Sequence, residues 1–177
     1  GVGSGDRVAL MAGNGMVFFD IYLAVSYLGA ATVPINTSLT GPEVRYIIEN
    51  AEPVLSVADA KSVPRLADVM GGRRLLEEGS GDYENLLKSD PLTHIDGPTE
   101  NDVALIIYTS GTTGQPKGAI HRHRDMVVTS QYYGVETLNI REEDICYSAA
   151  KLFFAYGLGN SMNFPLNYGA SAILSDE

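Results

Sequence analysis

The stretch of the chain with the clearest chemical content runs from Tyr108 to Gly118 and reads YTSGTTGQPKG. Hydroxyl side chains and two glycines are gathered between Thr109 and Gly114, and Lys117 follows closely. Glycines let a backbone approach a ligand and present N–H groups in a concave nest that binds anions. Hydroxyls add neutral donors, and a lysine brings positive charge to a polyphosphate. This composition is typical of a loop that holds a triphosphate.

The main alternative for this stretch is a flexible linker rich in Ser, Thr and Gly. The flanking sequence argues against a linker, because an apolar strand is expected over 102–108 and another strand over 117–120. The spacing also differs from the Walker loop, which requires Gly-Lys-Ser/Thr after four intervening residues. Pro116 lies where that second glycine should be, and Gly118 follows the lysine. Walker-type nucleotide hydrolases are therefore disfavoured.

A second stretch, Leu152 to Leu158, is apolar and rich in aromatic residues. It is equally consistent with plain core packing and with the wall of a substrate pocket. Gly157 at the end of this stretch and Gly159 just after it do not complete a dinucleotide fingerprint, because Met162 lies where the third glycine is required. A dinucleotide-dependent dehydrogenase is thus also disfavoured.

Composition and charge exclude several other classes. The 177 residues carry a formal net charge of −10, which repels a nucleic acid backbone. A basic cluster of Lys117, Arg122 and Arg124 suits either a solvated helix start or a local attraction for an anionic ligand. Cys146 is the only cysteine, so no internal disulfide forms, and we interpret it as a core residue rather than a catalytic thiol. The three histidines lack the spacing of a zinc site, so no metal site is expected in this chain.

Short apolar runs alternate with helical patterns along the chain, which predicts an α/β fold with a largely parallel sheet and helices on both faces. Residues 71–101 have a weaker pattern, richer in Gly, Asp and Pro, and are predicted to form a surface excursion. The apolar stretch from Met16 to Val33 is interrupted by Asp20, so no membrane span is expected, and a cytoplasmic location is the default. Strands are predicted over 7–11, 32–35, 53–58, 74–76, 102–108, 117–120, 144–148 and 170–174. Helices are predicted over 14–31, 40–50, 62–70, 83–87, 121–138 and 156–166.

The run from Tyr108 to Gly118 resembles the phosphate-loop signature of the adenylate-forming superfamily, which contains acyl-CoA synthetases, peptide-synthetase adenylation domains and luciferases. The segments Tyr27–Asn36 and Leu152–Leu158 also resemble that family, the first its helix-to-strand segment and the second its aromatic segment beside the acyl pocket. The resemblance implies that the whole chain, 1–177, is part of the large N-terminal domain, with 108–118 as the phosphate loop and the C-terminal domain absent.

By this resemblance, the parent enzyme activates a carboxylic acid with ATP and Mg²⁺ and transfers the acyl group to coenzyme A. The residues implied in ATP phosphate binding are Thr109, Ser110, Gly111, Thr112, Thr113, Gly114 and Lys117. Those implied in the acyl pocket are Phe154, Ala155, Tyr156 and Gly157. No catalytic residue set is complete in this chain, and the isolated chain is expected to be inactive, an acid–thiol ligase only as part of its parent.

The sequence around Phe154 resembles that of benzoate-CoA ligases in particular, because a phenylalanine stands where other branches of the family have a histidine. A CoA ligase for hydroxybenzoate, aminobenzoate, cinnamate or a medium-chain fatty acid remains an alternative, as does a non-catalytic nucleotide-binding module. The expected partners are a small carboxylic acid, ATP and coenzyme A, and association into a homo-oligomer stays open.

Overall fold

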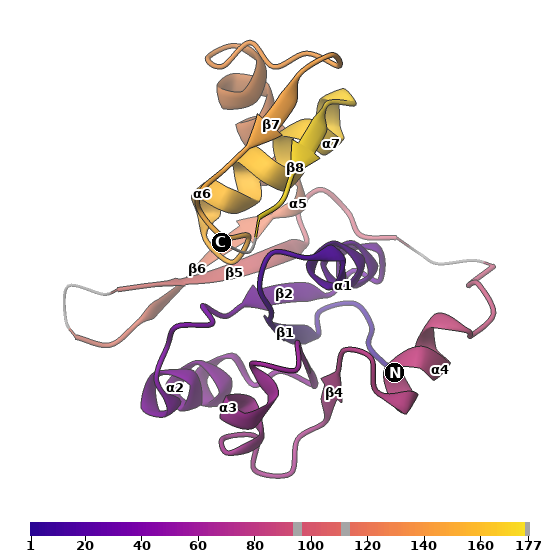
Figure 1. The fold of residues 1–177 in the computed structure, drawn as a ribbon, viewed down its shortest axis with the longest axis vertical. Coiled ribbons are helices and arrows are strands. Elements are labelled where there is room, and N and C mark those ends of the chain that lie inside the picture. Colours follow the sequence, from indigo (N-terminus) through magenta and orange to yellow (C-terminus); the bar gives the residue numbers. More distant parts are fainter. Residues whose placement is uncertain (94–96, 111–113, 176–177) are drawn as a thin grey trace.

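The computed structural model describes residues 1–93, 97–110 and 114–175 (Figure 1). Its central feature is a six-stranded sheet, accompanied by a smaller sheet of two strands. The elements are β1 (Arg7–Met11), α1 (Met16–Tyr27), β2 (Ala31–Pro34), α2 (Gly41–Ala51), β3 (Leu55–Ala58), α3 (Val63–Ala67), β4 (Leu75–Glu77), α4 (Gly81–Leu87), β5 (Val103–Thr109), β6 (Lys117–Arg122), α5 (His123–Thr129), the π-helical η1 (Ser130–Val135), β7 (Ile145–Tyr147), α6 (Ala155–Leu158), the π-helical η2 (Gly159–Asn163), α7 (Phe164–Tyr168) and β8 (Ser171–Ile173).

The large sheet has the strand order β4-β3-β1-β2-β5-β6. Neighbouring strands are parallel from β4 to β5, and only β6 is antiparallel to its neighbour. The small sheet pairs β7 with β8 in parallel. Since parallel strands need helical crossovers, which cover the sheet faces, this topology matches the alternating sequence pattern. The predicted fold class is confirmed.

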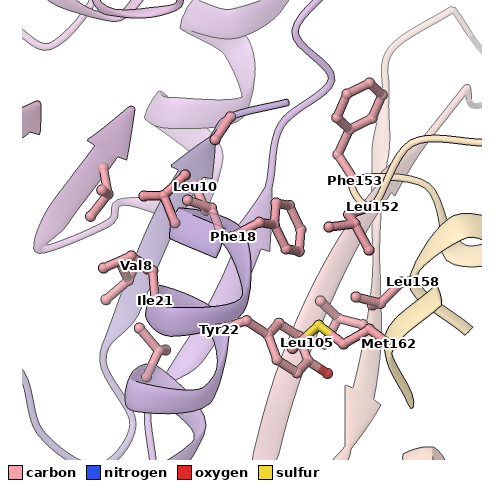
Figure 2. Close-up of a cluster of buried hydrophobic side chains, with 14 of the residues drawn as sticks. Val8, Leu10, Phe18, Ile21, Tyr22, Leu105, Leu152, Phe153, Leu158 and Met162 are labelled. Carbon is pink, nitrogen blue, oxygen red and sulfur yellow. The ribbon is translucent and has the colours of Figure 1, made fainter. Parts of the chain in front are cut away.

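Two hydrophobic cores cover the opposite faces of the large sheet. On one face, Ala9, Met11 and Val33 pack with buried residues of α2 and α3. On the other face, Val8 and Leu10 pack with α1. Helix α1 and Leu105 of β5 pack in turn against buried residues of the segment from Leu152 to Met162 (Figure 2).

The start of α2 illustrates how local sequence sets an element. Thr40 is the N-cap residue, and the Glu43 carboxylate accepts from the backbone N–H of Thr40 at 2.8 Å. Pro42 lies in the first turn, where its missing N–H costs nothing. Thr40 and Glu43 thus form a capping box, with the residue types and spacing that define this motif.

Two predicted helices differ from the observed ones. The helix expected over 121–138 is α5 followed by the π-helical η1, and that expected over 156–166 is α6, η2 and α7 in succession. Each π-helical segment contains a glycine against the ring of Phe164. A Cβ atom would lie 3.3 Å from Phe164 at Gly134 and 2.9 Å from it at Gly159. The wider π turns therefore occur where two segments pack closely around one aromatic ring.

Residues 71–101, for which we predicted a surface excursion, combine buried and exposed parts. Leu75–Glu77 pair with β3 as the edge strand β4, and Tyr83 of α4 is buried in the α1-side core. Leu86, Leu87 and Leu92 are exposed. Across the described ranges, no helix combines the length and apolar character needed to cross a membrane.

Candidate functional site

The predicted phosphate loop connects the antiparallel strands β5 and β6, in which Thr109 and Lys117 are register partners. Both residues and Ser110 are exposed. Gly114 has a φ angle of +93°, a backbone conformation that residues other than glycine rarely adopt. Gly111, Thr112 and Thr113 lie outside the described residues. The structure therefore brings the two ends of the loop, with one hydroxyl and one cation, directly opposite each other.

The base of this hairpin is fixed to α2. The hydroxyl of Tyr108 donates to Asn50 Oδ1 at 2.5 Å, and burial, with a smaller contribution from Tyr46, raises the pKa of Tyr108. A Cβ atom on Gly118 would lie 2.9 Å from Ile106 Cγ2 and 3.3 Å from Tyr108 Cζ. Glycine at position 118 thus leaves room for the Tyr108 ring to cross the neighbouring strand.

A cavity of about 560 Å³ lies between the loop and α2. One side comes from Ser110 and the loop residues that follow Gly114, and the other from the exposed side of α2. The α2 side was not singled out from the sequence, because a charged helix face is usually a solvated one. The Glu43 carboxylate in this wall is held by Thr40, whose backbone N–H and hydroxyl lower its pKa. The full lining is Pro42, Glu43, Arg45, Tyr46, Glu49, Ser110, Gly114, Gln115 and Pro116.

The predicted acyl-pocket residues lie at the start of α6. Phe154 is the N-cap residue and its ring packs on Phe153, with centroids 4.7 Å apart. Phe154 and Tyr156 are 47% and 62% exposed, so their rings are available to a ligand. Gly157 differs, since it is buried and a Cβ atom there would lie 2.1 Å from the carbonyl oxygen of Lys151. Its need for glycine is therefore steric.

The loop cavity does not extend to the predicted acyl-pocket residues Phe154–Gly157. The cavity at the loop is lined by no residue of the aromatic segment. Phe153 lines a separate cavity of about 200 Å³ near the carboxyl ends of β1 and β3. Three cations, Lys61, Arg65 and Lys151, also line this second cavity.

Asn14 is a buried polar residue that sequence analysis missed. Its Oδ1 accepts from the backbone N–H of Leu152 at 2.8 Å, and its Nδ2 donates to the carbonyl of Ser175 at 2.9 Å. An asparagine just before a helix is normally interpreted as a cap. No local signal could have identified a partner 138 residues away.

Two titratable residues outside the loop cavity also have shifted pKa values, His123 and Cys146. Burial lowers the pKa of His123, against the opposing effect of Asp102. Burial and, less strongly, Asp144 raise the pKa of Cys146, which disfavours its reactive thiolate form. Within the residues that the structure describes, no group of three or more His, Cys, Asp or Glu side chains could hold a metal ion.

Comparison with known proteins assigns this arrangement to a family. The family model described as "AMP-binding enzyme" matches residues 1–177. The chain belongs to the AMP-binding enzyme family. This confirms the resemblance drawn from the phosphate loop and the aromatic segment.

Individual relatives of this AMP-binding chain act on aromatic acids. It is 36% identical over 97% of its length to a benzoate-CoA ligase of Thauera aromatica, of which it covers 34%. A benzoate CoA ligase structure from Burkholderia xenovorans LB400 matches with a TM-score of 0.90 and 31% identity, over 99% of this chain and 36% of that one. An anthranilate CoA ligase in complex with anthranoyl-AMP matches with a TM-score of 0.92 and 29% identity, over 99% of this chain and 35% of that one. The chain thus spans about one third of the length of these relatives.

Proposed function

We propose that this AMP-binding chain forms part of an ATP-dependent CoA ligase for an aromatic acid, with benzoate or a close analogue as substrate. The observation that carries the proposal is the 36% identity to a benzoate-CoA ligase over 97% of the chain. The exposed rings of Phe154 and Tyr156 support it, because flat apolar surfaces suit a benzene ring better than a flexible chain.

The proposed reaction has two steps. The acid carboxylate attacks the α-phosphate of ATP, which forms an acyl-adenylate and releases pyrophosphate. The thiol of coenzyme A then attacks the acyl carbon and releases AMP. Negative charge grows on the departing pyrophosphate during the first step, and preorganised donors nearby lower that barrier. Lys117 neutralises this charge, while the hydroxyls and N–H groups of 109–114 donate to the β- and γ-phosphates.

The hairpin geometry supports these roles. Thr109 and Lys117 lie opposite each other on β5 and β6, so both flank whatever the loop holds. The cavity beside the loop, about 560 Å³, falls within the range of small-molecule sites. Mg²⁺ would arrive with ATP as part of the substrate, and we assign no described residue to hold it.

A ligase for a substituted benzoate is the second candidate. The similarity to an anthranilate CoA ligase, with a TM-score of 0.92, favours it. A comparison of benzoate with substituted benzoates distinguishes the two candidates.

ATP–pyrophosphate exchange by the full-length polypeptide tests the proposal. Benzoate, anthranilate, hydroxybenzoates, cinnamate and hexanoate would be compared at equal concentration, followed by thioester formation with coenzyme A. We expect exchange with benzoate or a substituted benzoate, and an acyl-CoA product. Exchange with hexanoate alone would overturn the aromatic assignment. No exchange with any acid would favour a non-catalytic nucleotide-binding module.

A further inference from the structure

Asn14 joins the end of the first strand to two distant segments. Asn14 is 8% exposed, and both polar atoms of its side-chain amide form hydrogen bonds. Oδ1 accepts from the N–H of Leu152, and Nδ2 donates to the carbonyl of Ser175. Lys151 Nζ donates to the same carbonyl at 2.9 Å. Asn14 therefore links the turn after β1 with the segment before α6 and the segment after β8.

The chemistry of this junction requires an amide. A side-chain amide carries one acceptor and one kind of donor, as a peptide group does, so asparagine can bridge an N–H and a carbonyl at once. Aspartate would keep only the acceptor, and alanine would keep neither. Without Asn14 Oδ1, the N–H of Leu152 would be buried without that partner, which is costly enough to shift the backbone.

The junction lies two residues from the first exposed ring of the aromatic segment. Leu152 and Phe153 are buried in the core that contains Phe18 of α1 (Figure 2). The rings of Phe153 and Phe154 pack with centroids 4.7 Å apart, and Phe154 is the N-cap residue of α6. A displacement of the backbone at Leu152 thus passes directly to the rings of Phe154 and Tyr156.

We infer that Asn14 is a positioning residue that sets the backbone of the aromatic segment 152–157 and thereby the fit of the acid. This inference rests on the proposed function in one respect, namely that Phe154 and Tyr156 contact the acid. The hydrogen bond to Leu152 is the determining one, since it lies on the path to those rings, while Lys151 still donates to the carbonyl of Ser175.

The test uses the full-length polypeptide with Asn14→Ala, Asn14→Asp and the control Val57→Ala. Val57 is fully buried in the same core, on β3, so the control lowers stability through a cavity without removing this junction. Hydrogen exchange of peptides covering 150–158 and the KM values for benzoate and for ATP would be measured well below the unfolding temperatures.

For Asn14→Ala we expect faster hydrogen exchange in 150–158 and a KM for benzoate raised about tenfold, with the KM for ATP within about twofold of the unsubstituted value. The hydrogen-exchange rate in 150–158 and the KM for benzoate of Asn14→Asp should lie between those of Asn14→Ala and the unsubstituted polypeptide, because aspartate keeps the acceptor for the N–H of Leu152. Val57→Ala should change neither the protection of 150–158 nor the KM for benzoate.

If Asn14→Ala behaves like Val57→Ala in both measurements, the inference is wrong, although the proposed function stands. A second outcome combines two results: Asn14→Ala selectively loses hydrogen-exchange protection in 150–158, and the unsubstituted polypeptide shows no ATP–pyrophosphate exchange with any acid. The positioning of the segment would then hold, and the proposed function would fail.

Discussion

The hydroxyl of Tyr108 donates to Asn50 Oδ1, and this 2.5 Å hydrogen bond joins residues 58 positions apart. Tyr108 is the penultimate residue of β5, directly before the hydroxyl-rich stretch that begins at Thr109, and Asn50 lies in the last turn of α2. The same helix forms the other wall of the cavity beside the loop. The bond therefore fixes the two walls of that cavity relative to each other.

Removal of this bond should cost stability and nucleotide affinity together. Tyr108→Phe should lower the free energy of unfolding by about 1 kcal/mol, as is usual for one hydrogen bond. Urea denaturation of Tyr108→Phe, Asn50→Ala and the double variant would measure the free energy of unfolding of each. If the two effects simply add in the double variant, the bond contributes nothing, and the position of the loop has another cause.

Lys117 should affect nucleotide use with little effect on stability, because its side chain is exposed on β6. In the full-length polypeptide, Lys117→Ala should reduce kcat/KM for ATP in the exchange assay about 10- to 100-fold, in line with loss of one charged contact to the departing phosphates. Lys88→Ala, another exposed lysine at the end of α4, is the matched control. Equal activities of the two variants would remove Lys117 from the phosphate site.

Gly157→Ala should prevent correct folding around α6. The added Cβ would lie 2.1 Å from the Lys151 carbonyl oxygen and 2.5 Å from that of Ala150, and backbone atoms cannot rotate away. We expect a loss of more than about 3 kcal/mol or an insoluble product. Gly41→Ala is the control, because nothing lies within 4 Å of a Cβ atom there. A soluble Gly157→Ala variant with unchanged thermal unfolding would contradict this account.

His123 should make stability depend on pH below neutrality. Its Nε2 is buried without a hydrogen-bond partner among the described residues, and burial lowers its pKa from the ordinary 6.5. The folded state then binds fewer protons than the unfolded state, so stability falls as the pH drops below 6.5 and levels off below the folded pKa. Thermal unfolding between pH 8 and pH 5 would reveal this slope.

In His123→Gln the part of the slope that belongs to this residue should disappear. His121→Gln is the natural comparison, because it removes a neighbouring imidazole from β6. If the slope survives in His123→Gln but is lost in His121→Gln, then His121 and not His123 causes the pH dependence, and our account is wrong.

Several features could be predicted from the sequence because their causes are local. The capping box of Thr40 and Glu43 and the glycine that ends α1 each depend on a few adjacent residues. The loop after β5 could be recognised for the same reason, since its glycines, hydroxyls and lysine are contiguous. The family assignment followed from that contiguity.

Other features depend on geometry that the sequence pattern of one segment does not show. The antiparallel pairing of β6 with β5, within an otherwise parallel sheet, follows from the short connection between them rather than from the pattern of either strand. The helix predicted over 121–138 becomes π-helical at Ser130–Val135, where Gly134 packs closely on Phe164 of a later segment. The partners of Asn14 could not be predicted, because they lie 138 and 161 residues away.

The arrangement of strands also bears on the order in which the molecule assembles. Strands β1 to β4 pair among themselves within the first 77 residues, whereas β5 joins them through the single register pair of Thr32 with Leu105. Contacts that close long stretches of chain form slowly, and a nascent chain folds from its N-terminal side. We therefore expect β1 to β4 to pair before β5, because the pairing of Thr32 with Leu105 closes a longer stretch of chain than any pairing among the first four strands.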